Sequence, residues 1–88
     1  MAFEFRFPRT KFVDEKGIVG QTYHIESELE EVWDAETLPD MQRIAEEIVD
    51  LSHSVETLLR ILAEKHGVDL EAVCAAVIEK NRARGYYS

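Results

Sequence analysis

Two stretches of the chain carry one pattern, Ile25-Glu26-Ser27-Glu28-Leu29-Glu30-Glu31-Val32 and, nineteen residues later, Ile44-Ala45-Glu46-Glu47-Ile48-Val49-Asp50-Leu51. In each stretch the apolar residues recur at the spacing that places them on one side of an α-helix. Glu28 and Glu31 stand three residues apart, as do Glu47 and Asp50, so each pair lies on one flank of its apolar stripe. The pattern predicts two amphipathic helices, each with two carboxylates at the edge of the core.

The four carboxylates converge if the two apolar stripes pack on each other as an antiparallel pair. Like charges at such short range repel, and they cannot all stay ionised without a cation. Ligands that are all oxygen suit a hard cation such as Mg²⁺ or Mn²⁺. We therefore predict a metal site formed by Glu28, Glu31, Glu47 and Asp50.

The same period extends both stretches and adds a third helix. The first helix is expected from about Gln21 or Thr22 to Thr37, before the break at Leu38-Pro39-Asp40. The second is expected from about Asp40 to His66, where Gly67 suits the left-handed residue that ends many helices. The third follows Asp69 as its N-cap. Its apolar stripe, which we expect to be core, comprises Leu70, Val73, Cys74, Val77 and Ile78. Three main helices predict an all-α helical bundle.

Residues 1–20 are expected to form an extended arm with a turn. Phe3, Phe5 and Phe7 alternate with charged residues at the period of a strand, and Pro8 ends the run. The segment from Phe12 to Val19 is expected to be a turn or small hairpin. Three aromatic side chains on an exposed arm would be a liability, so we expect them to cover a neighbouring subunit or the outside of the helices.

The chain of 88 residues is one domain, close to the size at which a single core is marginal. A wide apolar sector, comprising Leu58, Leu59, Ile61 and Leu62, lies far along the second helix. We expect a homodimer or homotetramer that buries this sector and completes the bundle. Trp33, on the far flank of the first helix's stripe, is expected in the core or in an interface.

The charge balance and the single cysteine exclude several classes of protein. Eighteen acidic against ten basic residues give a net charge of −8, which argues against binding to a nucleic-acid backbone. One cysteine allows no internal disulfide and no cysteine-based zinc site. No segment has the length needed to span a bilayer, and the N-terminus has no signal-like apolar run. A cytoplasmic location is the default expectation.

The end of the third helix leaves its apolar stripe. Steps of four and then three residues from Val77 reach Asn81 and Arg84, and Lys80 stands beside them. Either the helix emerges into solvent there, or it points an amide and a guanidinium at a ligand.

These motifs resemble those of a known family. The spacing Glu28-x-x-Glu31 and, after fifteen intervening residues, Glu47-x-x-Asp50 is similar to the E-x-x-E and E-x-x-D signature of the MazG-like, all-α nucleoside triphosphate pyrophosphohydrolases. The ending Lys80-Asn81-Arg82-Ala83-Arg84-Gly85-Tyr86-Tyr87 looks like the Lys-Asn-x-x-Arg-Gly-Tyr ending of compact members. In the fuller pattern two acids are adjacent, whereas here Ser27 precedes Glu28. Residues 21–88 would then be a MazG-like helical pyrophosphohydrolase domain.

The resemblance implies hydrolysis of ribo- or deoxyribonucleoside triphosphates between the α and β phosphates, for house-cleaning or control of nucleotide pools. The products are a monophosphate and pyrophosphate, and the cofactor is Mg²⁺ or Mn²⁺. The four predicted ligands match the family's metal positions, and we expect Glu28 or Glu47 to take the proton of the attacking water. Lys80, Asn81 and Arg84 are the expected substrate-binding residues.

Two other functions fit parts of the sequence. A non-catalytic helical interaction or regulatory module would use its acids as a solvated face and its aromatic arm to grip another protein, but it does not explain the shared register of the two carboxylate pairs. A degenerate family member that binds nucleotide and metal without turnover fits the serine at position 27. Pyrophosphate release discriminates between these alternatives.

Overall fold

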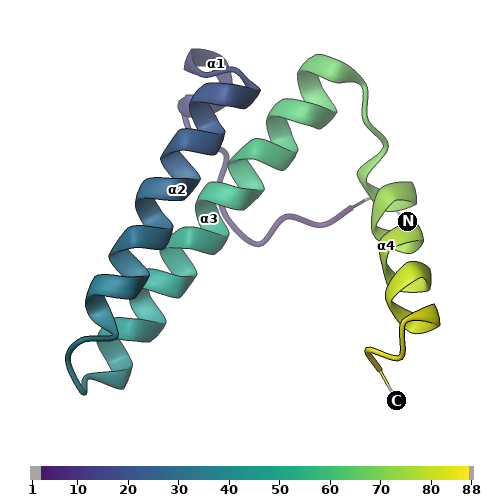
Figure 1. Cartoon of the computed structure of the whole chain (residues 1–88). Helices are drawn as coiled ribbons and strands as arrows, with labels where there is room; N and C mark the ends of the chain where they lie inside the picture. Colours follow the sequence, from purple (N-terminus) through teal and green to yellow (C-terminus); the bar gives the residue numbers. More distant parts are fainter. Residues whose placement is uncertain (1–2, 88) are drawn as a thin grey trace.

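The computed structural model describes residues 3–87. The regular secondary structure of these residues is helical, with no strand. The helices are α1 (Phe12–Glu15), α2 (Ile18–Ala35), α3 (Met41–His66) and α4 (Leu70–Ala83). Figure 1 shows α2 and α3 side by side as a hairpin, with α4 standing apart from it. The predicted all-α class and its three main helices are therefore confirmed.

The α2–α3 hairpin forms where the sequence predicts the break between helices. Leu38 and Pro39 interrupt the helical pattern, and Asp40 caps α3 by accepting a hydrogen bond from the Arg43 N–H at 3.1 Å. Val32 of α2 and Ile61 of α3 are both buried. α2 begins at Ile18, earlier than expected, with Gly17 as its extended N-cap. The two apolar stripes are only partly covered, since Ile48 in the second is 45% exposed.

A turn or a small hairpin was expected between Phe12 and Val19, and of these the hairpin is wrong. The chain forms one helical turn, α1, and then enters α2. Val13 becomes fully buried in this turn, whereas two short extended pairs would have had no strand to pair with. Arg9 fixes the turn to α3 through ion pairs with Asp14 at 2.7 Å and Glu64 at 3.0 Å.

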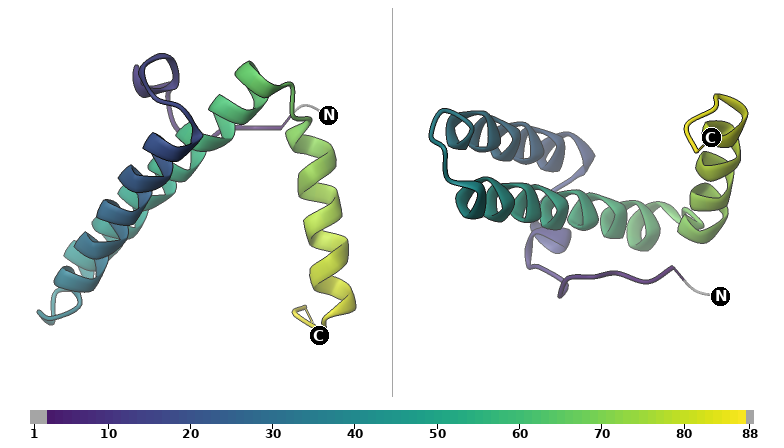
Figure 2. Two further views of the ribbon diagram at one scale, coloured as in Figure 1. Left: turned by 45° about the horizontal axis from the view of Figure 1, so that its top comes forward. Right: turned by 90° about the horizontal axis from the view of Figure 1, so that it is seen from below.

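Residues 3–10 form an extended arm that runs along α3, on the side away from α2 (Figure 2). The Glu56 carboxylate accepts hydrogen bonds from the backbone N–H groups of Arg6 and Phe7, both at 3.0 Å. Arg60 donates to the Phe7 carbonyl at 2.8 Å, and its guanidinium lies 3.9 Å from the centre of the Phe5 ring. The arm thus covers the outside of its own helix, one of the two locations expected for it.

α4 leaves the hairpin after Gly67, whose φ of 66° is the left-handed conformation that ends α3. Its N-cap is Asp69, as predicted. Only Leu70 of this helix is buried, and Cys74 is exposed. The expectation that Cys74 is core is therefore wrong for the single chain, because α4 makes few contacts with the other helices. None of the described helices is both long enough and apolar enough to cross a membrane.

Candidate metal centre and active site

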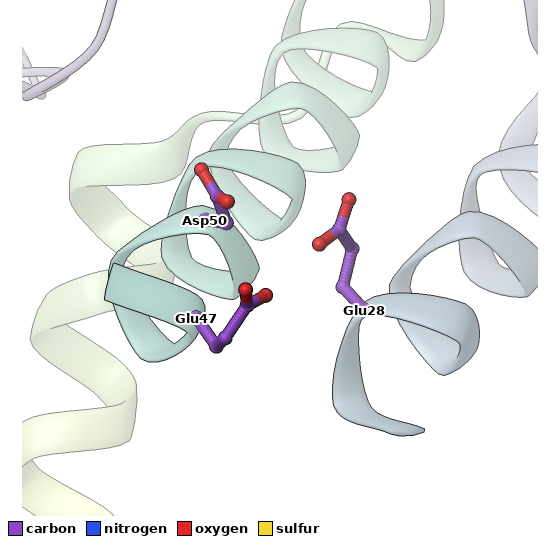
Figure 3. A group of neighbouring side chains, drawn as sticks. All are labelled: Glu28, Glu47 and Asp50. Carbon is purple, nitrogen blue, oxygen red and sulfur yellow. The ribbon is translucent and has the colours of Figure 1, made fainter. Parts of the chain in front are cut away.

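Three carboxylates converge in the middle of the hairpin. Glu28 of α2 faces Glu47 and Asp50 of α3, and one oxygen of each lies within 4.8 Å of the others (Figure 3). Glu47 and Asp50 share a face because they stand three residues apart on one helix. The antiparallel packing of α2 and α3 then brings Glu28 opposite them.

Glu47 gives this cluster a carboxylate oxygen without a hydrogen-bond partner among the described residues. Its side chain is only 12% exposed, and its Oε1 accepts a hydrogen bond from Arg43 Nε at 2.9 Å. Its Oε2 is buried and has no hydrogen-bond donor within the described part of the chain. A buried carboxylate oxygen without a partner is costly unless a cation or another donor reaches it. The residues present therefore fit an oxygen-coordinated divalent cation.

Glu28 is held by a histidine of its own helix. His24 Nε2 lies 3.2 Å from Glu28 Oε1, and the Glu28 side chain is 17% exposed. Burial lowers the pKa of His24, the charge of nearby Lys16 lowers it further, and Glu31 opposes them. A neutral imidazole can orient the carboxylate by a hydrogen bond without adding a positive charge that competes with a cation.

The structure brings together three of the four predicted ligands. Glu31 is exposed and is not part of the cluster. Because it stands three residues after Glu28, it lies on the same side of α2. Glu31 lies one turn further along α2, toward the α2–α3 connection.

The predicted substrate-binding residues of the tail lie elsewhere in the single chain. Lys80 and Arg84 are exposed and Asn81 is half-buried, at the far end of α4. Figures 1 and 2 both show this end of α4 well separated from the hairpin. Arg84 Nη1 lies 3.4 Å from the hydroxyl of Tyr86, so its described contact is local.

Sequence reasoning missed three residues around the cluster. Arg43 stands four residues before Glu47, and His24 stands four before Glu28, the spacing at which helical side chains pair. That spacing was a usable signal. Gln21 continues the apolar stripe four residues before Ile25, and a polar residue on such a stripe signals a buried partner.

The chain is an all-helical hairpin with a cluster of carboxylates contributed by both of its long helices. Within it, the family profile of the MazG nucleotide pyrophosphohydrolase domain matches residues 21–86. The chain belongs to this MazG family, as the sequence signature predicts. The searches of curated proteins and of solved structures returned no match.

Proposed function

We propose that the protein is a divalent-metal-dependent nucleotide pyrophosphohydrolase, which cleaves nucleoside triphosphates between the α and β phosphates to a monophosphate and pyrophosphate. One observation carries the proposal: three carboxylates converge on a point beside a buried, unpartnered oxygen, Glu47 Oε2, in a chain of the MazG family. Packing of two helices does not by itself require the two carboxylate pairs to share one register, whereas a metal site does.

Glu28, Glu47 and Asp50 would hold Mg²⁺ or Mn²⁺, with Glu31 joining them from the exposed side of α2. The bound metal would neutralise phosphate charge and make a bound water more acidic. The protein's own side chains would carry out the proton transfer. Glu28 or Glu47 takes the proton of the attacking water.

Two neighbouring side chains keep these carboxylates in position. Arg43 fixes one oxygen of Glu47 and leaves the other directed to the centre of the hairpin, where no other donor of the described chain satisfies it. His24, one turn earlier in α2, has its Nε2 3.2 Å from one oxygen of Glu28. Both positioning residues act through a carboxylate.

The tail completes the site in an oligomer. Lys80, Asn81 and Arg84 suit the phosphate oxygens that metal does not neutralise, but they lie at the separate end of α4. We therefore place the tail of one subunit beside the carboxylates of another. The nucleotide substrate makes the cytoplasm the expected location.

Exposed apolar surface supports such an assembly. The described residues bury few large apolar side chains, whereas Tyr23 is 68% exposed, Trp33 58% and Val49 50%. α4 presents Val73, Val77 and Ile78 at 41–46% exposure. Large apolar side chains exposed in this number favour a protein interface, and a homodimer or homotetramer would cover them.

The deciding experiment is pyrophosphate release from a panel of ribo- and deoxyribonucleoside triphosphates, with Mg²⁺, with Mn²⁺ and with a chelator. The wild type should release pyrophosphate and monophosphate only with a divalent cation. Glu47→Gln should abolish the reaction, whereas Glu26→Gln, at an exposed position of the same hairpin, should not. Metal and nucleotide binding without turnover would identify a degenerate member, and the absence of both would identify an interaction module.

A further inference from the structure

A pocket of about 170 Å³ opens beside the carboxylate cluster. Glu28 and Asp50 form its side nearest the candidate metal. Gln21 of α2, Ser54 of α3 and Phe12 of α1 are among the residues that line the rest. A whole small-molecule ligand needs about 300 Å³ or more, so this pocket suits one ring of a larger molecule.

Gln21 gives the pocket a defined hydrogen-bonding character. The residue is fully buried, and its Nε2 donates to the Ser54 carbonyl at 3.0 Å. The amide cannot be reversed, because Oε1 would then face another acceptor. Oε1 is buried and has no donor among the described residues. Gln21 is therefore fixed as an acceptor, and the group that satisfies it must bring a hydrogen.

Aromatic side chains make the pocket suitable for a flat ring. Phe12, His24 and His53 all line it. Phe7 of the arm stacks on the His53 ring with the ring centres 4.6 Å apart, and His53 Nε2 lies 3.3 Å from the Pro8 carbonyl. The arm thereby fixes the His53 ring at the pocket.

The wall formed by Phe12 and Thr10 lies outside the segment that matches the family, residues 21–86. Thr10 Oγ1 lies 3.2 Å from Thr57 Oγ1, which ties this wall to α3. The arm therefore contributes to the shape of the pocket from outside the matched segment.

We propose that this pocket receives the base of the nucleotide and that Gln21 Oε1 determines specificity by accepting a hydrogen bond from an N–H group of the base. The assignment rests on the proposed function, since it places the triphosphate at the adjacent carboxylates. A base with its amino or imino N–H directed at Gln21 satisfies the buried oxygen, whereas a base without that hydrogen leaves it unpaired.

The test compares nucleotides that differ in one donor. For a best substrate with adenine or cytosine, the matched analogue lacks the exocyclic amino group. For guanine or uracil, the analogue carries a methyl group on the ring nitrogen in place of its hydrogen. The wild type should lose roughly 5- to 150-fold in kcat/KM on the analogue, the effect of leaving one buried acceptor unpaired. In Gln21→Met, which keeps the length of the side chain, the two nucleotides should become equivalent.

Two control variants separate recognition from folding. Glu26→Gln, exposed on the same helix, should keep the wild-type ratio. Phe12→Leu should weaken the binding of every nucleotide, because the ring contributes contact area. It should leave the ratio of kcat/KM between the nucleotide and its matched analogue unchanged, because the ring makes no hydrogen bond. Thermal melting of each variant shows that it is folded.

A second readout does not depend on turnover. Nucleosides without phosphates, added to the full chain in a chelator, should shift the amide resonances of Gln21 and Ser54 in the wild type. If turnover occurs but the ratio is the same in wild type and Gln21→Met, the pocket assignment is overturned and the proposed function stands. A loss seen with 2′- or 3′-deoxy nucleotides in place of the base analogues would assign the donor to the sugar and overturn base recognition. Nucleoside shifts without any turnover would overturn the function and leave the pocket standing.

Discussion

Arg43 Nε donates to one oxygen of Glu47 at 2.9 Å, and the other oxygen of that carboxylate remains buried without a donor. One oxygen of Glu47 therefore pairs with the exposed guanidinium of Arg43, and the other is left for a partner inside the hairpin. Arg43 is 58% exposed, so its ion pair contributes little to stability, about 0–1 kcal/mol. Besides orienting Glu47, Arg43 places a positive charge beside the cluster.

Metal binding should stabilise the fold. Mg²⁺ or Mn²⁺ at a hundred times its Kd should add about 2.7 kcal/mol to the free energy of unfolding, because it binds the folded cluster and not the unfolded chain. Glu47→Gln or Asp50→Asn should remove the rise in Tm that each cation produces. Calorimetry that detects no divalent-cation binding by the wild type at millimolar concentration would show that no such site exists.

Removal of Arg43 should strengthen metal binding. In Arg43→Met the carboxylate cluster keeps its three acids and loses a competing positive charge, so Mn²⁺ affinity should rise several-fold, on the order of 1 kcal/mol for one nearby charge. Titration calorimetry measures the change. Arg82→Met is the matched control, since its ion pair with Glu79 lies on α4, away from the cluster. Equal affinities in wild type and Arg43→Met would contradict this role.

The sequence predicts the hairpin because each helix carries its own evidence: a regular apolar period, a break at Pro39 and caps at Asp40 and Asp69. The convergence of Glu28 on Glu47 and Asp50 follows from the same register. The secondary structure of residues 12–19 does not follow from their sequence, because a short apolar run fits either a strand or a turn of helix. Burial of Val13 against α3 decides between them.

Other parts of the site depend on contacts distant in the sequence. Gln21 becomes a fixed acceptor only because it meets the carbonyl of Ser54, 33 residues away. The arm's attachment to Glu56 spans about 50 residues. Periodicity says nothing about such pairings, since it describes one helix at a time. For the same reason it identified the apolar stripe of α4 but not the surface that would cover it.

Assembly should depend on the exposed face of α4. Val77 is 41% exposed in the single chain, and a charge there would be buried and unpaired in an oligomer. Val77→Asp should shift the protein to monomers in light scattering at micromolar concentration. Glu36→Lys, in the exposed connection after α2, should leave the mass unchanged. A stable wild-type monomer would contradict both the assembly and the shared site.

Docking of α1 should weaken in acid. Arg9 lowers the pKa of Asp14 and of Glu64 chiefly through its hydrogen bonds to them. A carboxylate with a lowered pKa stabilises the fold above its unfolded pKa, 3.8 for Asp14 and 4.5 for Glu64, and that contribution is lost as the pH falls through the folded pKa. The protection of the α1 amides against hydrogen exchange, taken relative to the intrinsic exchange rate at each pH, should therefore fall below about pH 4.

Arg9→Gln should remove this pH dependence, because both carboxylates then lose their charged partner. Lys11→Gln, an exposed neighbour, is the control and should retain it. An unchanged pH profile in Arg9→Gln would show that the ion pairs do not hold α1.

The tail should matter for the nucleotide and not for the fold. Lys80 and Arg84 are exposed in the single chain, so replacing either by Ala should leave Tm and metal binding unchanged. If the tail reaches the phosphates in a neighbouring subunit, each loss should cost about 1.5–3 kcal/mol in transition-state stabilisation, roughly 10- to 150-fold in kcat/KM. Arg82→Ala is the matched control on the same helical end, because Arg82 pairs with Glu79.

A mixed oligomer of Glu47→Gln and Arg84→Ala subunits tests whether the site is shared. It should regain activity at sites where the intact tail of a Glu47→Gln subunit lies beside the intact carboxylate cluster of an Arg84→Ala subunit. Wild-type kcat/KM in both Lys80→Ala and Arg84→Ala would exclude the tail from the site.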